Sequence, residues 1–230
     1  MAPSPAATTP QTPRAPVTRD RALGAAVALA DAGGIDSLSM RKLARELGVE
    51  AMSLYYHVTS KDEILDGMVE IVVGEMALSD AHSPWRAALR ERAESARRVL
   101  GRHPWAISQI SARTTRATMA FHDATIGCLL NAGFSMPLAA HALSIIDSYV
   151  HGFALQEASL PLDDAGDIGA VTENILAEKE AMAEMFPHLT QMAATLILQP
   201  GYAYRHEFDF GLNLILDGLA AAHAAAPAVT

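Results

Sequence analysis

Residues 38–61 read Leu-Ser-Met-Arg-Lys-Leu-Ala-Arg-Glu-Leu-Gly-Val-Glu-Ala-Met-Ser-Leu-Tyr-Tyr-His-Val-Thr-Ser-Lys, and this stretch predicts two short helices joined by a tight turn. Ser39 is suited to cap the first helix, because its hydroxyl can accept a hydrogen bond from a free amide of the first turn. Gly48 is suited to end that helix in the left-handed conformation. The second helix is expected over 50–56, with Leu54 pointing inward. Apolar residues at helical spacing form the inner face of the first helix: Leu43, Ala44 and Leu47.

The outer side of the second helix carries small, hydroxylated and aromatic side chains, which are Ala51, Ser53, Tyr55, Tyr56 and His57. This composition suits a helix that enters the major groove of DNA, because small side chains allow a close approach and polar ones donate to phosphates and base edges. A helix-turn-helix reader has this geometry. The alternative is a helical hairpin that only packs, since short helix pairs are common.

The same stretch resembles the DNA-binding segment of the TetR family of bacterial repressors, and most of all its tetracycline-repressor branch. The resemblance is carried by Leu38-Ser39-x-Arg41-Lys42-Leu43-Ala44, Leu47-Gly48-Val49-Glu50 and Leu54-Tyr55-x-His57-Val58-x-x-Lys61. It implies that the DNA contacts come from Arg41, Ser53, Tyr55, Tyr56, His57 and Lys61, with Ala51 on the same surface. Ala51 and Met52 replace the Gln-Pro of the tetracycline repressors, so a different operator sequence is expected.

Composition favours an all-helical protein, because half of the 230 residues are hydrophobic, alanine is abundant and aromatic residues are few. The net charge of −9 is unevenly distributed. Residues 1–61 contain seven Arg and Lys against five Asp and Glu, and the remaining residues contain ten against twenty-one. The N-terminal module over 1–61 is therefore basic and the rest of the chain is acidic, which would keep the acidic body off the phosphates. The expected organisation is a disordered tail over 1–16, a DNA-binding domain over 17–78 and a regulatory and dimerisation domain over 79–225.

Helices are expected over 19–32 and 61–77 in the first domain. The second helix begins at a capping box, in which Ser60 is followed three residues later by Glu63. The helix over 85–102 carries a run of arginines, Arg86, Arg90, Arg92, Arg97, Arg98 and Arg102. This run could form a second DNA surface, but a solvated face pairing with Glu91 and Glu94 is the commoner outcome.

Further helices are expected over 105–113, 115–131, 136–159, 171–185, 189–198 and 204–222. Those over 136–159 and 204–222 are apolar around more of their circumference than one core face needs. The resemblance continues in Asn131–Ser135 and Phe210–Leu219. It implies that these two helices pair with their twofold mates in a homodimer, which would present two reading helices to a palindromic operator.

The resemblance also implies a small-molecule pocket in the second domain, with candidate lining residues Trp105, Gln109, Met119, His122, Asp147, His151, Gln156, Met185 and Phe186. Each of these residues has a simpler interpretation as part of the core. Gln109 stands where the family's metal-chelating histidine is expected. The sequence therefore predicts no metal and no cofactor, and an apolar or aromatic effector.

The sequence predicts a ligand-responsive transcriptional repressor rather than an enzyme, because it shows no Gly-rich phosphate loop, nucleophile elbow or His-Glu-x-x-His pair. A helical binding protein or an enzyme that never contacts DNA is the alternative. The N-terminal residues lack the apolar core of a signal peptide, and the longest uncharged run, 124–146, is interrupted by Asn131, Gly133 and Pro137. A cytoplasmic location with no membrane association is expected.

Overall fold

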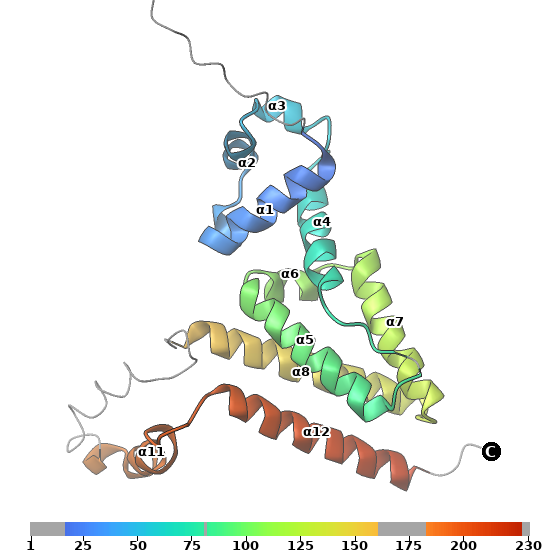
Figure 1. Ribbon diagram of the computed structural model, residues 1–230, viewed down its shortest axis with the longest axis vertical. Coiled ribbons are helices and arrows are strands. Elements are labelled where there is room, and N and C mark those ends of the chain that lie inside the picture. The colour runs from blue at the N-terminus through green and yellow to red at the C-terminus, as the bar shows by residue number, and fades with distance from the viewer. Residues whose placement is uncertain (1–16, 81, 161–182, 227–230) are drawn as a thin grey trace, which may run out of the picture. The chain divides into compact units, whose positions relative to one another are not determined.

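The secondary structure is helical and contains no strand in the residues that the computed structural model describes, 17–80, 82–160 and 183–226 (Figure 1). This confirms the all-helical prediction. Within these ranges, no helix is both long enough and apolar enough to cross a membrane. The tail predicted over 1–16 lies outside the described residues.

The chain divides into two compact units between Ile64 and Leu65. This division falls inside helix α4 (Lys61–Gly74), whereas the sequence placed the domain boundary near residue 78, just beyond the end of the same helix. The predicted domain extents stay a prediction.

The first unit contains α1 (Arg19–Gly33), the short η1 (Ile35–Ser37), α2 (Met40–Leu47) and α3 (Ala51–Leu54). Thr18 caps α1, since its hydroxyl accepts from the amide of Arg21 at 3.2 Å. The face of α1 that meets α2 is made of small and aliphatic side chains that are all buried: Ala22, Leu23, Ala26, Val27 and Ala30. This apolar layer holds the helix pair α2–α3 in place.

Helix α3 is shorter than the helix predicted over 50–56. It ends at Leu54, and single turns follow, in which the amide of His57 donates to the Leu54 carbonyl at 2.9 Å. Val58 is fully buried just after these turns. The burial of Leu54 and Val58, four residues apart, fixes both ends of this segment to the core and leaves the residues between them outside it.

The second unit is arranged around α8 (Met136–Ser159), which packs against α5, α7 and α12 (Figure 1). Besides the part of α4 beyond Ile64, the other helices in the described part of this unit are α5 (Trp85–Arg102), α6 (Ala106–Ala112), α7 (Arg116–Asn131), α11 (Pro187–Met192), the π-helical η2 (Ala193–Ile197) and α12 (Arg205–Ala225). The helix predicted over 171–185 lies outside the described residues, apart from 183–185, which are helical.

The prediction of a solvated arginine face on α5 holds for Arg98 and Arg102, which are exposed, and is wrong for Arg92. Arg92 is only 1% exposed, and its Nη2 lies 2.8 Å from Oδ1 of Asp147 on α8. The expected pairing within the helix occurs between Arg90 and Glu94, at 3.6 Å. The other partners lie on neighbouring helices: Arg86 pairs with Asp217, Arg90 donates to Asn213, Arg97 pairs with Glu157, and Arg102 pairs with Glu75. Because α5 faces several helices at once, its charged side chains link them.

Tyr149 fixes the packing of α12 on α8. Its hydroxyl donates to the carbonyls of Glu207 and Phe208, at 3.1 and 3.0 Å, and its ring stacks on Phe208. Burial raises the pKa of Tyr149 to about 12, so the hydroxyl keeps its proton as a donor. A Cβ at Gly211 would lie 2.2 Å from this hydroxyl, so glycine is needed at this crossing.

Candidate functional site

The turn between α2 and α3 is built as a helix-turn-helix. The Ser39 hydroxyl accepts from the amide of Lys42 at 3.2 Å, and Gly48 adopts the left-handed conformation with φ 70° and ψ 36°. The amide of Val49 donates to the Ala44 carbonyl at 3.0 Å, which closes the turn. The predicted cap and the predicted stop are both confirmed, and together they fix the direction in which α3 starts.

The side chains predicted to contact DNA lie on the outside of the first unit. Tyr56 is 89% exposed and Tyr55 is 46% exposed, whereas Leu54, the last residue of α3, is fully buried. The remaining predicted residues are exposed or half-buried, namely Arg41, Ala51, Ser53, His57 and Lys61. This surface offers two cations, two phenols, an imidazole and a hydroxyl, which are the donor groups that phosphates and base edges accept from. Contact with DNA stays a prediction for each residue.

The start of α4 is capped differently from the predicted capping box. The Ser60 hydroxyl accepts from the amide of Glu63 at 3.1 Å, as expected. The Glu63 carboxylate does not return to Ser60. It accepts instead from the amide and the hydroxyl of Thr59, at 2.7 and 2.8 Å, and pairs with Arg19 at 3.5 Å. These bonds, first among them the one from the Thr59 amide, lower the pKa of Glu63 and hold the turn that carries Lys61.

A cavity of about 360 Å³ lies in the second unit. It is walled by residues at the end of α6, along α7 and along the middle of α8, which are Ile110, Ser111, Arg113, Thr114, Thr118, Met119, His122, Ser144, Asp147, Ser148 and His151. Four of the nine residues predicted to line an effector pocket meet here: Met119, His122, Asp147 and His151. A second hollow of about 520 Å³ shares Met119 and His122 and adds Arg116 and Asp123 of α7.

A charged network forms the floor of this cavity. Asp147 lies between Arg92, at 2.8 Å, and His122, whose Nε2 is 3.3 Å from the other carboxylate oxygen. Burial alone would raise the pKa of Asp147, but the hydrogen bond from His122 and the charge of Arg92 outweigh it and lower that pKa. The Arg92 guanidinium also lies 4.0 Å from the ring centre of Phe121, which adds a cation–π contact. Asp147 is therefore an anion balanced by a buried cation.

His151 stands one helical turn beyond Asp147 in the same wall. Burial lowers its pKa, and the charge of Asp147 opposes that shift only in part. A neutral imidazole, able to donate through one nitrogen and accept through the other, therefore faces the cavity.

The other predicted pocket residues do not line this cavity. Trp105 is buried in the core, and Gln109 accepts from Nε of Arg113 at 3.4 Å. Gln156 accepts from the Tyr204 hydroxyl at 3.0 Å on an exposed part of α8. Met185 and Phe186 are 70% and 48% exposed next to α11. Their role in a pocket stays a prediction.

Sequence reasoning missed Arg113, Ser144 and Ser148. A signal was present for the serines, because Ser144, Asp147, Ser148 and His151 follow the spacing of one helical face and form a polar stripe on an otherwise apolar helix. Arg113 had no such signal, since it follows a short helix and reaches the cavity only through the fold.

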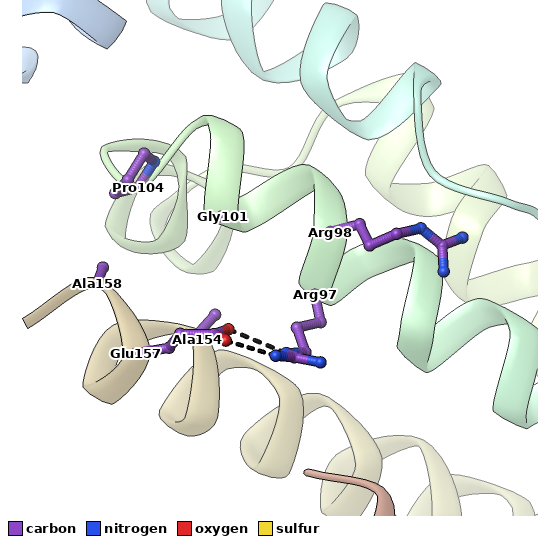
Figure 2. Close-up of a pocket in the computed structure, with 7 residues that line it drawn as sticks. All are labelled: Arg97, Arg98, Gly101, Pro104, Ala154, Glu157 and Ala158. Atoms are coloured by element: carbon purple, nitrogen blue, oxygen red, sulfur yellow. Dashed lines mark hydrogen bonds and ion pairs between the residues drawn. The ribbon is translucent and has the colours of Figure 1, made fainter. Parts of the chain in front are cut away.

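A third hollow, of about 480 Å³, lies between the ends of α5 and α8 (Figure 2). The ion pair of Arg97 with Glu157 crosses its floor, and the Arg97 guanidinium also covers the rings of Phe153 and Phe208. Its charged groups already serve the packing of α5 on α8. Within the described residues, no group of three or more His, Cys, Asp and Glu side chains is placed to hold a metal ion.

Two family models match the chain. Residues 22–68 match the model for bacterial regulatory proteins of the tetR family, and residues 79–223 match the model for the tetracyclin repressor-like C-terminal domain. The chain is 34% identical over 218 residues to the HTH-type transcriptional repressor DrrR1 of Streptomyces coeruleorubidus, covering 90% of this chain and 78% of that protein. It is 33% identical over 212 residues to an HTH-type transcriptional regulator of Saccharopolyspora erythraea, covering 89% and 85%.

Solved structures show the same likeness. The TetR family protein ActR of Streptomyces coelicolor, in complex with actinorhodin, superposes with a TM-score of 0.75 and 29% identity. This match covers 93% of the present chain and 100% of ActR.

Proposed function

Because this chain belongs to the TetR family of DNA-binding transcriptional regulators, we propose that it is a homodimeric repressor released from a palindromic operator by a small molecule. The exposed donor surface on α3 and the turns that follow it carries this proposal. Tyr55, Tyr56 and His57 stand outside the core while Leu54 and Val58 hold the segment to it. Solvated aromatic side chains contribute nothing to the core, and a DNA partner gives them a role.

A second copy of the chain is the proposed partner of α8 and α12. Both helices leave large apolar side chains in solvent, with Ile145 and Leu155 exposed by 47% and 57%, and Phe210 and Leu214 by 64% and 59%. Covering such side chains in a twofold dimer would remove apolar surface from water. The dimer would also present two copies of the reading surface to the two halves of an operator.

The effector is proposed to bind the cavity walled by α6, α7 and α8. Most of the residues that wall the cavity are polar or charged, and Ile110 and Met119 are its apolar residues, so the site suits a small molecule with several hydrogen-bonding groups beside an apolar part. The likeness to ActR, of which a structure holds actinorhodin, supports an organic effector. We further propose that the chain acts in the cytoplasm by binding and not by catalysis. The coupling would be a population shift, with the effector favouring a conformation that the operator disfavours.

Fluorescence anisotropy with a labelled duplex from the region upstream of the protein's own coding sequence tests the proposal. Titrations at two salt concentrations, against a scrambled duplex, should show saturable binding with at least ~10³-fold preference for the upstream duplex. The double substitution Tyr55→Ala/His57→Ala should abolish this preference and leave the circular dichroism spectrum unchanged. Asp36→Ala, at an exposed residue of the same unit, serves as the control and should bind as the wild type does.

Equal affinity of the wild-type protein and the double variant for the upstream duplex would contradict the proposed reading surface. A helical binding protein or an enzyme without DNA contact would show that result, because neither depends on Tyr55 or His57.

A further inference from the structure

Arg113 both lines the cavity and contacts helix α4. It follows the last residue of α6 and lines the cavity. Its Nη1 also donates to Oδ1 of Asp66, on α4, at 2.7 Å. The Arg113 side chain is 18% exposed and that of Asp66 is 53% exposed. The cation is therefore held in the protein, while its carboxylate partner stands mostly in water.

The charges that face the cavity differ in how they are balanced. The ionisable groups of its wall are Arg113, His122, Asp147 and His151. Asp147 is balanced from behind by Arg92, at 2.8 Å, and its other carboxylate oxygen lies 3.3 Å from Nε2 of His122. Arg113 pairs with Asp66, which lies outside the wall. Within this wall, a ligand with a negative charge therefore meets one permanent cation whose partner it can replace.

The other residues of the wall indicate which further groups such a ligand would carry. Ile110 and Met119 offer apolar surface, and the hydroxyls of Ser144 and Ser148 offer donors along α8. A guanidinium binds a planar acidic group through paired hydrogen bonds. The chemistry of the wall therefore fits an organic molecule with an apolar part and one acidic substituent.

Resting on the function proposed above, we propose that the effector is an organic anion, and that its acidic group replaces Asp66 as the partner of Arg113. The replacement removes the ion pair between α6 and α4 at Asp66. Helix α4 is continuous from Lys61 to Gly74, and Lys61 is one of the predicted DNA-contact residues. When a ligand occupies the cavity, Asp66 is released from Arg113, and α4 loses the ion pair that ties it to the residue after α6.

Two fluorescent probes of nearly the same skeleton test the ligand class without DNA: anilinonaphthalene sulfonate, an anion, and N-phenylnaphthylamine, which is neutral. Arg113→Gln should weaken binding of the anion by about tenfold or more, because a charge-assisted pair is lost, and should leave binding of the neutral probe unchanged. Asp66→Asn should strengthen binding of the anion by about threefold or more, because its competitor is gone. Combined with Arg113→Gln, the Asp66 substitution should have no further effect.

Matched variants separate these effects from general changes of charge. Arg98→Gln removes an exposed arginine of α5 that lies outside the cavity, and Glu70→Gln removes the next acidic residue of α4. Both should bind the two probes as the wild type does. The proposal is overturned if Arg113→Gln keeps the affinity for the anion, if Asp66→Asn leaves it unchanged, or if wild-type protein prefers the neutral probe. Asp66 is an exposed residue, so its substitution should leave the fold intact. A change in probe affinity in this variant would therefore report on the ion pair and not on unfolding.

The coupling is tested with the operator complex. The sulfonate should lower operator affinity of the wild-type protein and have no such effect on Asp66→Asn, in which the ion pair is already absent. An equal loss in both proteins would overturn the proposed route through Asp66. Failure of the proposed function is distinguishable, because it would abolish operator binding and leave the probe titrations unaffected.

Discussion

The side chains predicted to touch DNA come from one contiguous stretch, residues 41–61, whereas the proposed effector cavity takes its wall from three helices between Ile110 and His151. In the first region the predicted contact side chains lie outside the core. In the second, Asp147 both faces the cavity and balances the buried Arg92. Stability and function can therefore be changed separately in the first region, and are linked in the second.

The largest expected effect is the loss of unfolding free energy in Asp147→Asn, which removes the counter-charge of Arg92. The substitution leaves Arg92 as a buried cation without a counter-charge, and breaking a buried pair in this way costs about 3–5 kcal/mol. Denaturant unfolding followed by circular dichroism measures the loss. Asp123→Asn, at an exposed acid of α7, is the control and should unfold as the wild type does.

Adding Arg92→Met to Asp147→Asn should restore much of the lost stability, because the stranded charge is then removed. If Asp147→Asn alone unfolds at the wild-type denaturant concentration, the floor of the cavity is not held by this pair.

Substitutions at two positions only two residues apart, Leu54 in α3 and Tyr56 in the turn after it, should sharpen the contrast in the first region. Leu54→Ala empties a fully buried site and should cost about 2–5 kcal/mol of unfolding free energy. Tyr56→Ala removes a side chain that is 89% exposed, so its stability should change by less than about 0.5 kcal/mol. Its operator affinity should fall by about 1–3 kcal/mol, measured by anisotropy. A large loss of stability in Tyr56→Ala would show that this side chain is structural.

Two glycines of α12 offer a matched comparison in the second unit. A Cβ at Gly211 would lie 2.2 Å from the Tyr149 hydroxyl, while a Cβ at Gly218 would meet nothing within 4 Å. Gly211→Ala should cost about 1–3 kcal/mol through overpacking. Gly218→Ala should stabilise the helix by up to about 1 kcal/mol, because alanine favours the helical backbone. Thermal unfolding of the two variants measures both, and melting shifts of the same sign would contradict the close crossing at Tyr149.

The smallest effect expected concerns His151. Because burial lowers its pKa in the folded protein, the unfolded chain takes up a proton more readily than the folded one. The contribution of His151 to stability is therefore present above the unfolded pKa of 6.5 and is lost as the pH falls below that value. His151→Gln should unfold with a weaker dependence on pH between about 7.5 and 5.5 than the wild type. His141→Gln, at an exposed histidine of the same helix, should keep the wild-type dependence.

Much of the first region could be predicted from sequence, because its structure is local. Ser39, Gly48 and Leu54 act within one or two turns of their own position, and their roles as cap, stop and core residue are confirmed. The length of α3 was predicted less well. It depends on the burial of Val58, which is decided by packing against the rest of the unit.

In the second region the sequence indicated the helices but misjudged their charged faces. Arg92 reads as one member of a solvated run of arginines, and only the position of Asp147, more than fifty residues away along the chain, makes its burial possible. The same holds for Arg113, whose partner Asp66 lies on another helix. When the partner of a charged side chain lies far away along the chain, the sequence does not indicate which residue will neutralise it.

By itself, the sequence determined the helical class and the caps and apolar faces that form the turn of residues 38–61, because each of these follows from interactions within a few residues. The tertiary structure alone decided which polar groups share the cavity and how Arg92 and Arg113 are balanced. Those arrangements require side chains from distant helices to meet, and the strength of a charge pair depends on distances and burial that only the folded chain defines.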